Sequence, residues 1–171
     1  SELSRIDSQM KTSRKGRRDE FRVALVGYTN AGKSTLMRAL SGADVLVEDR
    51  LFATLDSTTR SVELAHNRAI LLSDTVGFIK RLPHHLFASF RATLQETAEA
   101  NLLLHVVDMS HPYYESQIST VNEVLAELEV ENTPTIVVYN KIDQADDGEE
   151  ERLEKAFVDH PDKVAISAHT G

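Results

Sequence analysis

Cysteine is absent from all 171 residues, which excludes disulfide bonds and thiolate metal sites. The absence also fits a reducing compartment, so we expect a cytoplasmic protein. Long hydrophobic runs are missing too: no apolar stretch approaches the ~20 residues that a membrane-spanning helix needs, and the first residues lack the pattern of a secretory signal. With 41% hydrophobic and 27% charged residues, the composition is that of one ordinary globular domain.

Positive charge is scarce outside the first segment of the chain. The net charge is −8, yet residues 1–20 carry six Lys or Arg against four Asp or Glu. The basic cluster Lys11–Arg18 could contact RNA phosphates, or it could simply be solvated, as charged terminal segments usually are. We interpret residues 1–20 as a basic linker or the end of a connecting helix, and residues 21–171 as the folded domain. The acidic body argues against broad, sequence-independent binding of nucleic acid.

A phosphate-binding loop is predicted between a short apolar strand and a helix. The strand is expected at 21–26, and the segment GYTNAGKST follows at Gly27–Thr35. A helical pattern then continues to Gly42, with Leu36 and Leu40 on one face. The order strand, G-x-x-x-x-G-K-S and helix predicts that backbone N–H groups surround the α- and β-phosphates of a nucleotide. The residues expected to contact the nucleotide here are Asn30, Ala31, Gly32, Lys33, Ser34 and Thr35.

Magnesium and the γ-phosphate are assigned to this loop and to a second segment, DTVG. Lys33 is expected to reach the β- and γ-phosphates, and the Ser34 hydroxyl to ligate Mg²⁺. Asp74 ends an apolar strand expected at 69–73, so its carboxylate lies at the sheet edge where ligands of open α/β sheets bind. There it can hold a magnesium-bound water. The backbone N–H of Gly77 can donate to the γ-phosphate and be released when that phosphate leaves.

A third segment, NKID, predicts selection of guanine. It follows an apolar strand expected at 135–139. The Asp143 carboxylate can accept hydrogen bonds from guanine N1–H and from the 2-amino group, whereas adenine presents an acceptor at N1 and lacks that amino group. Asn140 can bond the base and tie neighbouring loops together. The Lys141 stem can cover one face of the ring.

The three segments together predict one GTP-binding pocket. A weaker fourth match supports it, because the last expected strand, 163–167, ends at Ser167, and the backbone N–H of Ala168 could meet guanine O6. Two interpretations of the pocket stay open: a GTP hydrolase, or a nucleotide-gated binding module in which occupancy matters and turnover only resets the protein. NKID argues against a third class, a phosphotransferase acting on a small substrate, and no Arg-rich lid sequence is visible.

The remaining pattern alternates strands and helices, which indicates an α/β fold. Further strands are expected at 61–65 and 101–108, and helices at 83–100, 114–128 and 149–157. The segments 61–65 and 69–73 flank a three-residue turn and could form an antiparallel hairpin. His105, inside an expected strand, is interpreted as a core histidine rather than a ligand. No amphipathic segment follows the last strand, so we expect the final covering helix to lie outside this sequence.

A threonine-rich segment, LFATLDSTTR, lies between the phosphate loop and DTVG at Leu51–Arg60. A GTPase needs one loop hydroxyl in this region to complete the magnesium shell when the γ-phosphate is present. Spacing alone does not choose between Thr54, Thr58 and Thr59, so the three alternatives remain open on the residues themselves.

These segments make the chain similar to the HflX family of ribosome-associated GTPases. The resemblance rests on VALVGYTNAGKSTL, LFATLD, LLSDTVGFIKRLP, LQET and NKID. It implies a Ras-like P-loop GTPase fold, with a six-stranded, mostly parallel sheet of order 2-3-1-4-5-6 flanked by helices. It also implies that Thr54 is the threonine that ligates Mg²⁺. The implied partner is the large ribosomal subunit, and the implied role is splitting or rescue of stalled ribosomes.

Two residues bear on the rate of hydrolysis. Phe78 follows D-x-x-G, where Ras has a glutamine that orients the attacking water, and phenylalanine neither donates nor accepts. We therefore expect slow intrinsic hydrolysis, with a partner supplying the missing group. Asn30 resembles the asparagine that helps hold K⁺ in potassium-activated GTPases; the alternative is an asparagine that suits a tight loop. The residues assigned to catalysis are Lys33, Thr54, Gly77 and Asn30.

Overall fold

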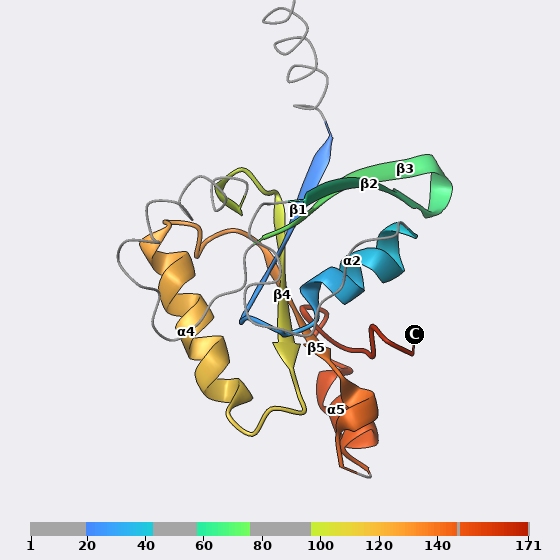
Figure 1. The fold of residues 1–171 in the computed structure, drawn as a ribbon, viewed down its shortest axis with the longest axis vertical. Coiled ribbons are helices and arrows are strands. Elements are labelled where there is room, and N and C mark those ends of the chain that lie inside the picture. The colour runs from blue at the N-terminus through green and yellow to red at the C-terminus, as the bar shows by residue number, and fades with distance from the viewer. Residues whose placement is uncertain (1–19, 43–57, 76–96, 147, 171) are drawn as a thin grey trace, which may run out of the picture.

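One sheet of six strands organises the chain, in the order β2-β3-β1-β4-β5-β6 (Figure 1). The computed structural model describes residues 20–42, 58–75, 97–146 and 148–170. Its strands are β1 (Phe21–Gly27), β2 (Thr58–Leu64), β3 (Arg68–Asp74), β4 (Leu102–Asp108), β5 (Thr135–Asn140) and β6 (Lys163–Ala165). Four neighbouring pairs run parallel and only β2 and β3 run antiparallel. The predicted α/β class, sheet order and antiparallel hairpin are therefore confirmed.

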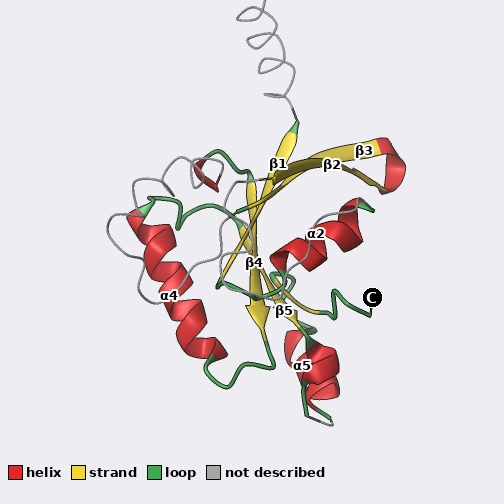
Figure 2. Cartoon of the chain, viewed as in Figure 1, coloured by secondary structure: helices red, strands yellow, loops and turns green. Residues whose placement is uncertain are grey.

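Three helices of the described chain flank this sheet (Figure 2). They are α2 (Lys33–Ser41), α4 (Tyr114–Glu127) and α5 (Glu149–Phe157), and two short 3-10 helices, η1 (Ala65–Asn67) and η2 (Ile142–Gln144), lie in connections. The helices predicted at 114–128 and 149–157 are confirmed. Of the helix predicted at 83–100, residues 83–96 lie outside the described part. No described helix has the length and apolarity to cross a membrane.

The core lies on both faces of the central strands, because successive side chains of a strand point to opposite sides. In β1, Val23 and Leu25 belong to the cluster that includes α2, while Ala24 and Val26 belong to the cluster that includes α4. The buried helix residues of these clusters are Leu36 and Met37 of α2, and Val121 and Leu125 of α4. Continuous apolar strands thus follow from burial on two sides.

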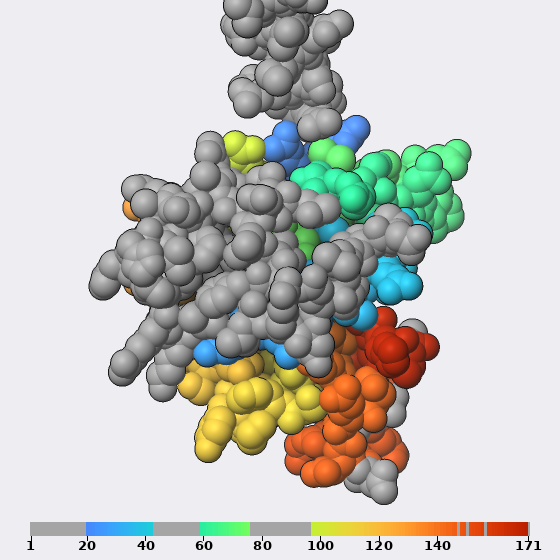
Figure 3. All heavy atoms as spheres, in the orientation of Figure 1, coloured from blue at the N-terminus to red at the C-terminus, as the bar shows by residue number. Residues whose placement is uncertain are grey.

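Three details differ from the sequence-based expectations. Leu40, which the helical pattern places on one face with the buried Leu36, is 45% exposed, in the last turn of α2 before the left-handed C-cap at Gly42. Strand β6 ends at Ala165, two residues early; Ile166 N–H still donates to the Tyr139 carbonyl of β5 at 2.8 Å, and the chain turns at 168–170. The β2–β3 hairpin is longer than the expected segments 61–65 and 69–73, since it pairs Thr58–Leu64 with Arg68–Asp74. Its atoms, green in Figure 3, lie at one side of the described surface.

Gly27 is required where β1 meets β4. A Cβ built on Gly27 would lie 2.5 Å from the carbonyl oxygen of Val106 in β4. A real Cβ does not approach a backbone oxygen so closely, so only glycine allows the two strands to pair here. The close approach brings the loop after β1 beside the end of β4.

His105 is confirmed as a core residue of β4. It is 2% exposed and pairs in the sheet with Val26 and Val137. Burial lowers its pKa to about 4, and the positive charge of Lys33 contributes in the same direction. The neutral ring is therefore the form that the folded chain contains at neutral pH.

This buried histidine predicts a pH-dependent stability. The unfolded chain takes up a proton on His105 near pH 6.5, whereas the folded chain does so only near pH 4. The stabilisation from the neutral ring is therefore complete above pH 6.5 and falls by about 3 kcal/mol as the pH drops to 4. Urea unfolding of the nucleotide-free chain at several pH values measures this loss.

The matched variant is His105→Gln, which keeps a polar side chain but cannot titrate. Its stability should fall less than that of the parent chain between pH 6.5 and 4, by the same amount of about 3 kcal/mol. Parallel curves for the two proteins would show that His105 does not titrate as described.

Candidate functional site

The carboxyl ends of four parallel strands meet at one edge of the sheet. β1 ends at Gly27, β3 at Asp74, β4 at Asp108 and β5 at Asn140. The pairing staggers these ends by a few residues, since Asp74 pairs with Leu25 and Gly27 pairs with Val106, whereas Asp108 pairs with Asn140. Ligands of open α/β sheets bind at this edge. All three sequence segments therefore reach the same place in the fold.

The phosphate loop leads directly into the N-terminus of α2. Gly32 is the N-cap, with a left-handed φ of 97°, and no side-chain hydrogen bond caps the helix there. A helix N-terminus presents backbone N–H groups and a partial positive charge, which suit a phosphate. Asn30 also has a left-handed backbone, with φ 62°, and its side chain is exposed.

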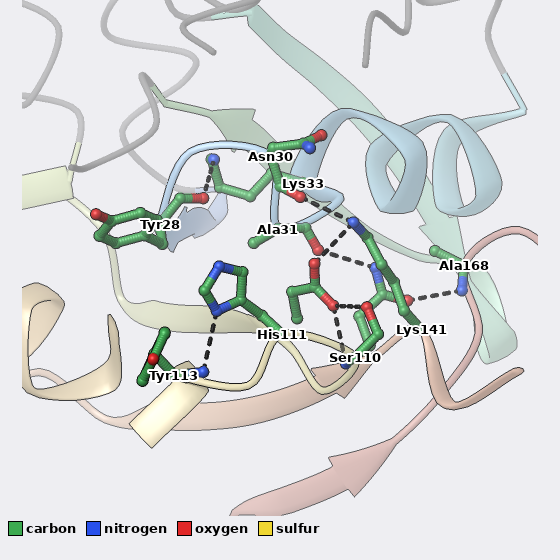
Figure 4. Close-up of polar contacts among 11 residues, drawn as sticks. Tyr28, Asn30, Ala31, Lys33, Ser110, His111, Tyr113, Lys141 and Ala168 are labelled. Carbon is green, nitrogen blue, oxygen red and sulfur yellow. Dashed lines mark hydrogen bonds and ion pairs between the residues drawn. The ribbon is translucent and has the colours of Figure 1, made fainter. Parts of the chain in front are cut away.

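Lys33 carries the positive charge of this loop in a buried position. Its Nζ donates to the Tyr28 carbonyl at 3.4 Å, a long contact that is drawn as a dashed line in Figure 4. Burial lowers the pKa of Lys33 below its ordinary value, and the Asp74 carboxylate opposes part of that shift. An anion beside the ammonium would relieve the desolvation of this charge.

Two oxygen donors lie together at the start of α2. Ser34 Oγ donates to Asp74 Oδ2 at 2.7 Å, and Asp74 is buried. The neighbouring Thr75 is also buried, and its hydroxyl donates to the Leu25 carbonyl at 2.7 Å. That bond fixes the chain just after Asp74 to β1. A hydroxyl and a carboxylate are hard ligands, which suit Mg²⁺. No cluster of three or more His, Cys, Asp or Glu that could hold a metal occurs among the described residues.

Asn140 joins the phosphate loop to the loop after β6. It is 2% exposed; its Nδ2 donates to the Ala31 carbonyl at 3.1 Å, and its Oδ1 accepts the Ala168 N–H at 2.9 Å. A Cβ on Gly32 would collide with the Asn140 amide, so glycine is needed there for this contact as well as for its φ. The two halves of the predicted pocket are thus hydrogen-bonded to each other.

Ala168, which is predicted to meet guanine O6 through its backbone N–H, lies beside Asn140. The Ala168 N–H donates to Asn140 Oδ1 at 2.9 Å. Ser167 is buried beside it, and its Oγ accepts the N–H of Thr170 at 3.1 Å. The segment after β6 therefore lies against Asn140, as the pocket requires, and the role of the Ala168 N–H toward a base stays a prediction.

Lys141 and Asp143 follow Asn140 at the same edge. Lys141 has a left-handed backbone with φ 65°, and its Nζ donates to the Asn30 carbonyl at 3.0 Å (Figure 4). Asp143 lies in η2 with an exposed side chain, where an incoming ligand can reach it. Ile142 N–H donates to the Ile166 carbonyl at 3.3 Å, which ties this loop to the end of β6.

Several predicted site residues lie outside the described part of the chain, namely Thr54, Gly77 and Phe78. Of the three candidate threonines, Thr59 is in β2, and its Oγ1 lies 3.1 Å from Ser73 Oγ of β3. The side chain of Thr35 is partly buried in the first turn of α2. The assignment of Thr54 to Mg²⁺ stays a prediction.

Sequence reasoning missed two residues of the site. Thr75 anchors the chain after Asp74, and Asp108 forms an ion pair with Lys141, Oδ2 to Nζ 2.9 Å. A signal for Asp108 was present, because it ends a buried apolar strand in the same way as Asp74 and Asn140 do. The sequence did not indicate that Lys141 is the partner of Asp108, since this pairing depends on the register of β4 against β5.

The comparisons with known proteins agree with this geometry. A family model described as 50S ribosome-binding GTPase matches residues 22–141. The chain belongs to this family. It is 56% identical over 156 residues to the GTPase HflX of Gluconacetobacter diazotrophicus, covering 91% of this chain and 34% of that protein. It is 46% identical over 173 residues to the GTPase HflX of Escherichia coli, covering 100% of this chain and 40% of that protein.

These relatives confirm the resemblance to HflX proteins, of which the chain spans only about a third to two fifths. Among solved structures, the chain is similar to Era in complex with MgGDPNP and nucleotides 1506–1542 of 16S ribosomal RNA. That match has a TM-score of 0.70 and 26% identity, and it covers 88% of this chain and 52% of the Era chain. The Ras-like fold expected from the resemblance is confirmed.

Proposed function

We propose that the chain binds GTP and GDP with Mg²⁺, hydrolyses GTP, and changes its association with the large ribosomal subunit according to the bound nucleotide. The observation that carries the proposal is the bridge through Asn140, which joins the phosphate loop to the segment expected to read the base. The family description, the HflX relatives and the MgGDPNP complex of Era support the nucleotide and the metal. The ribosomal partner rests on the family description and the resemblance alone.

The phosphates are proposed to bind at the N-terminus of α2. A phosphate oxygen would accept from the helix N–H groups and from Lys33 Nζ, which now makes only a 3.4 Å contact to a carbonyl. Because the ammonium is buried, an anion beside it gains more Coulomb energy than it would in water. Lys33 therefore binds the nucleotide and stabilises charge on the transferred group.

Ser34 and Asp74 are the described residues that would hold Mg²⁺, and Thr54 is the third expected ligand. A bound Mg²⁺ neutralises charge on the β- and γ-phosphates. Ser34 Oγ and Asp74 Oδ2 now share a 2.7 Å hydrogen bond, so both oxygens already face the same point. The hydroxyl of Ser34 and the carboxylate of Asp74 are therefore a pair of oxygen ligands that suits Mg²⁺.

The base is proposed to lie between the Lys141 stem and Asp143. The Asp143 carboxylate would accept from guanine N1–H and the 2-amino group, and adenine would leave that carboxylate facing a lone pair. Its exposed position in η2 leaves the carboxylate accessible to a ligand. Ala168 is proposed to bind guanine O6 by sharing the N–H that Asn140 now accepts.

Hydrolysis is proposed to be slow until a partner binds. Phe78 follows D-x-x-G and cannot orient water, and Gly77 is the proposed contact for the γ-phosphate. The missing electrostatic stabilisation comes either from a ribosomal element or from K⁺ held by Asn30, whose exposed side chain is accessible beside the loop. Comparing rates in K⁺ and Na⁺ at equal ionic strength separates the two.

Asp143→Asn tests the guanine assignment. Labelled GDP is bound to both proteins with Mg²⁺, and excess ATP is added as competitor. The parent chain should hold GDP against ATP, and the variant should bind GDP at least roughly 100-fold more weakly, because an amide N–H₂ faces the guanine donors.

Asp146→Asn is the matched control, since it changes an exposed carboxylate three residues away in the same connection. It should bind GDP as the parent chain does. Equal displacement of GDP by ATP from the parent chain would overturn the proposed base selection.

Phosphate release from GTP tests the proposed partner. The chain alone should turn over slowly, and purified large ribosomal subunits should raise the rate roughly 10- to 1000-fold, as partners that complete GTPase sites do. Small subunits at the same concentration serve as the control for added RNA and charge. Equal rates with both subunits would contradict a specific role for the large one, and rapid turnover by the chain alone would contradict the missing catalytic group.

A further inference from the structure

Lys141 is held from two sides. Its Nζ donates to Asp108 Oδ2 at 2.9 Å and to the Asn30 carbonyl at 3.0 Å. The first bond reaches the end of β4 and the second reaches the phosphate loop, as the dashed lines from Lys141 in Figure 4 show. The ion pair is largely shielded, with side-chain exposures of 22% for Lys141 and 13% for Asp108. A shielded, hydrogen-bonded ion pair fixes a flexible lysine far better than a surface pair does.

Asp108 is itself fixed by its surroundings. Its Oδ1 accepts from the backbone N–H of Ser110 at 2.9 Å and from Ser110 Oγ at 2.5 Å. The backbone of the next residue, Met109, donates to the Asn140 carbonyl at 3.0 Å, and Asp108 pairs with Asn140 in the sheet. Both carboxylate oxygens are thus engaged, and the strand end that carries them is tied to the strand end that carries Lys141.

The same network connects two residues with unfavourable backbones. Lys141 and Asn30 both have left-handed φ angles, 65° and 62°, although neither is glycine. Such conformations persist only where the surroundings impose them, and they concentrate at functional sites. Here the ammonium of one residue binds the carbonyl of the other, and Asp108 anchors that ammonium.

We propose that Asp108 is a positioning residue of the nucleotide site, which sets where the Lys141 stem lies over the base and couples the base-binding loop to the phosphate loop. This inference rests on the proposed function, because it assigns a base to the face of Lys141. Asp108 acts on the affinity for any guanine nucleotide, since it touches neither the phosphates nor the edge of the ring. Base selectivity stays with Asp143.

Asp108→Asn is the direct test, because the two side chains have the same shape. The amide can still accept from Ser110, but it loses the charge that holds Lys141. We expect GDP and GTP to bind roughly 10- to 100-fold more weakly, with unchanged preference for guanine over adenine nucleotides. Glu99→Gln is the matched control: it removes the carboxylate of another ion pair, Arg22 to Glu99 at 2.8 Å, and should bind as the parent chain does.

A double-mutant cycle with Lys141→Met separates positioning from general destabilisation. If Asp108 acts through Lys141, the Asp108→Asn change costs affinity in the parent chain and almost none in the Lys141→Met background. Equal losses in both backgrounds, or an unchanged affinity of Asp108→Asn, would overturn the inference. If Asp108→Asn does not fold, Ser110→Ala loosens the same carboxylate and should weaken GDP binding several-fold, and unchanged binding would again overturn it. A parent chain that binds no guanine nucleotide would instead overturn the proposed function.

Discussion

The register of the parallel strands is the constraint on which the whole site depends. Gly27 allows β1 to approach β4, and the pairing of Asp108 with Asn140 sets β4 level with β5. A shift of one residue in either pair would turn every side chain to the opposite face and bury the wrong set. The buried clusters on both faces of the sheet prevent such a shift. Stability of the core and geometry of the site are therefore one requirement rather than two.

The loops at that edge are cross-linked before any ligand binds. Asn140 bonds the phosphate loop and the loop after β6, and Lys141 bonds the phosphate loop and the end of β4. A site whose parts are held in place loses less conformational entropy on binding than one that must assemble around its ligand. In the proposed function, base recognition and phosphate binding share this framework, so neither loop can move without affecting the other.

Much of the fold was visible in the sequence. The apolar runs ending at Asp74 and Asn140 predicted strands whose ends carry ligands, and the turn between β2 and β3 predicted a hairpin. Local patterns suffice for these features, because a strand or a turn is specified within a few residues. Among the described motif residues, hydrogen bonds join Ser34 to Asp74 and Asn140 to Ala31, and the contacts of these residues with a nucleotide stay predictions.

The pairings inside the site were not visible, because they join residues far apart in the chain. Nothing local in the sequence indicates that Asp108 binds Lys141, or that the Asn140 amide takes the N–H that Ala168 was expected to offer a base. Leu40 fits the helical period of α2 and is nonetheless exposed. Periodicity describes one helix, whereas burial depends on where its neighbours end.

A crystal structure of the chain with GDP and Mg²⁺ tests the central claim most directly, that the strand ends and their cross-links form one ready-made guanine nucleotide site. The account predicts guanine against Lys141 and Asp143, the β-phosphate on Lys33 in place of the Tyr28 carbonyl, and retained bonds from Lys141 to Asp108 and from Asn140 to Ala31. A nucleotide bound elsewhere, or loops that separate to admit it, would contradict the account.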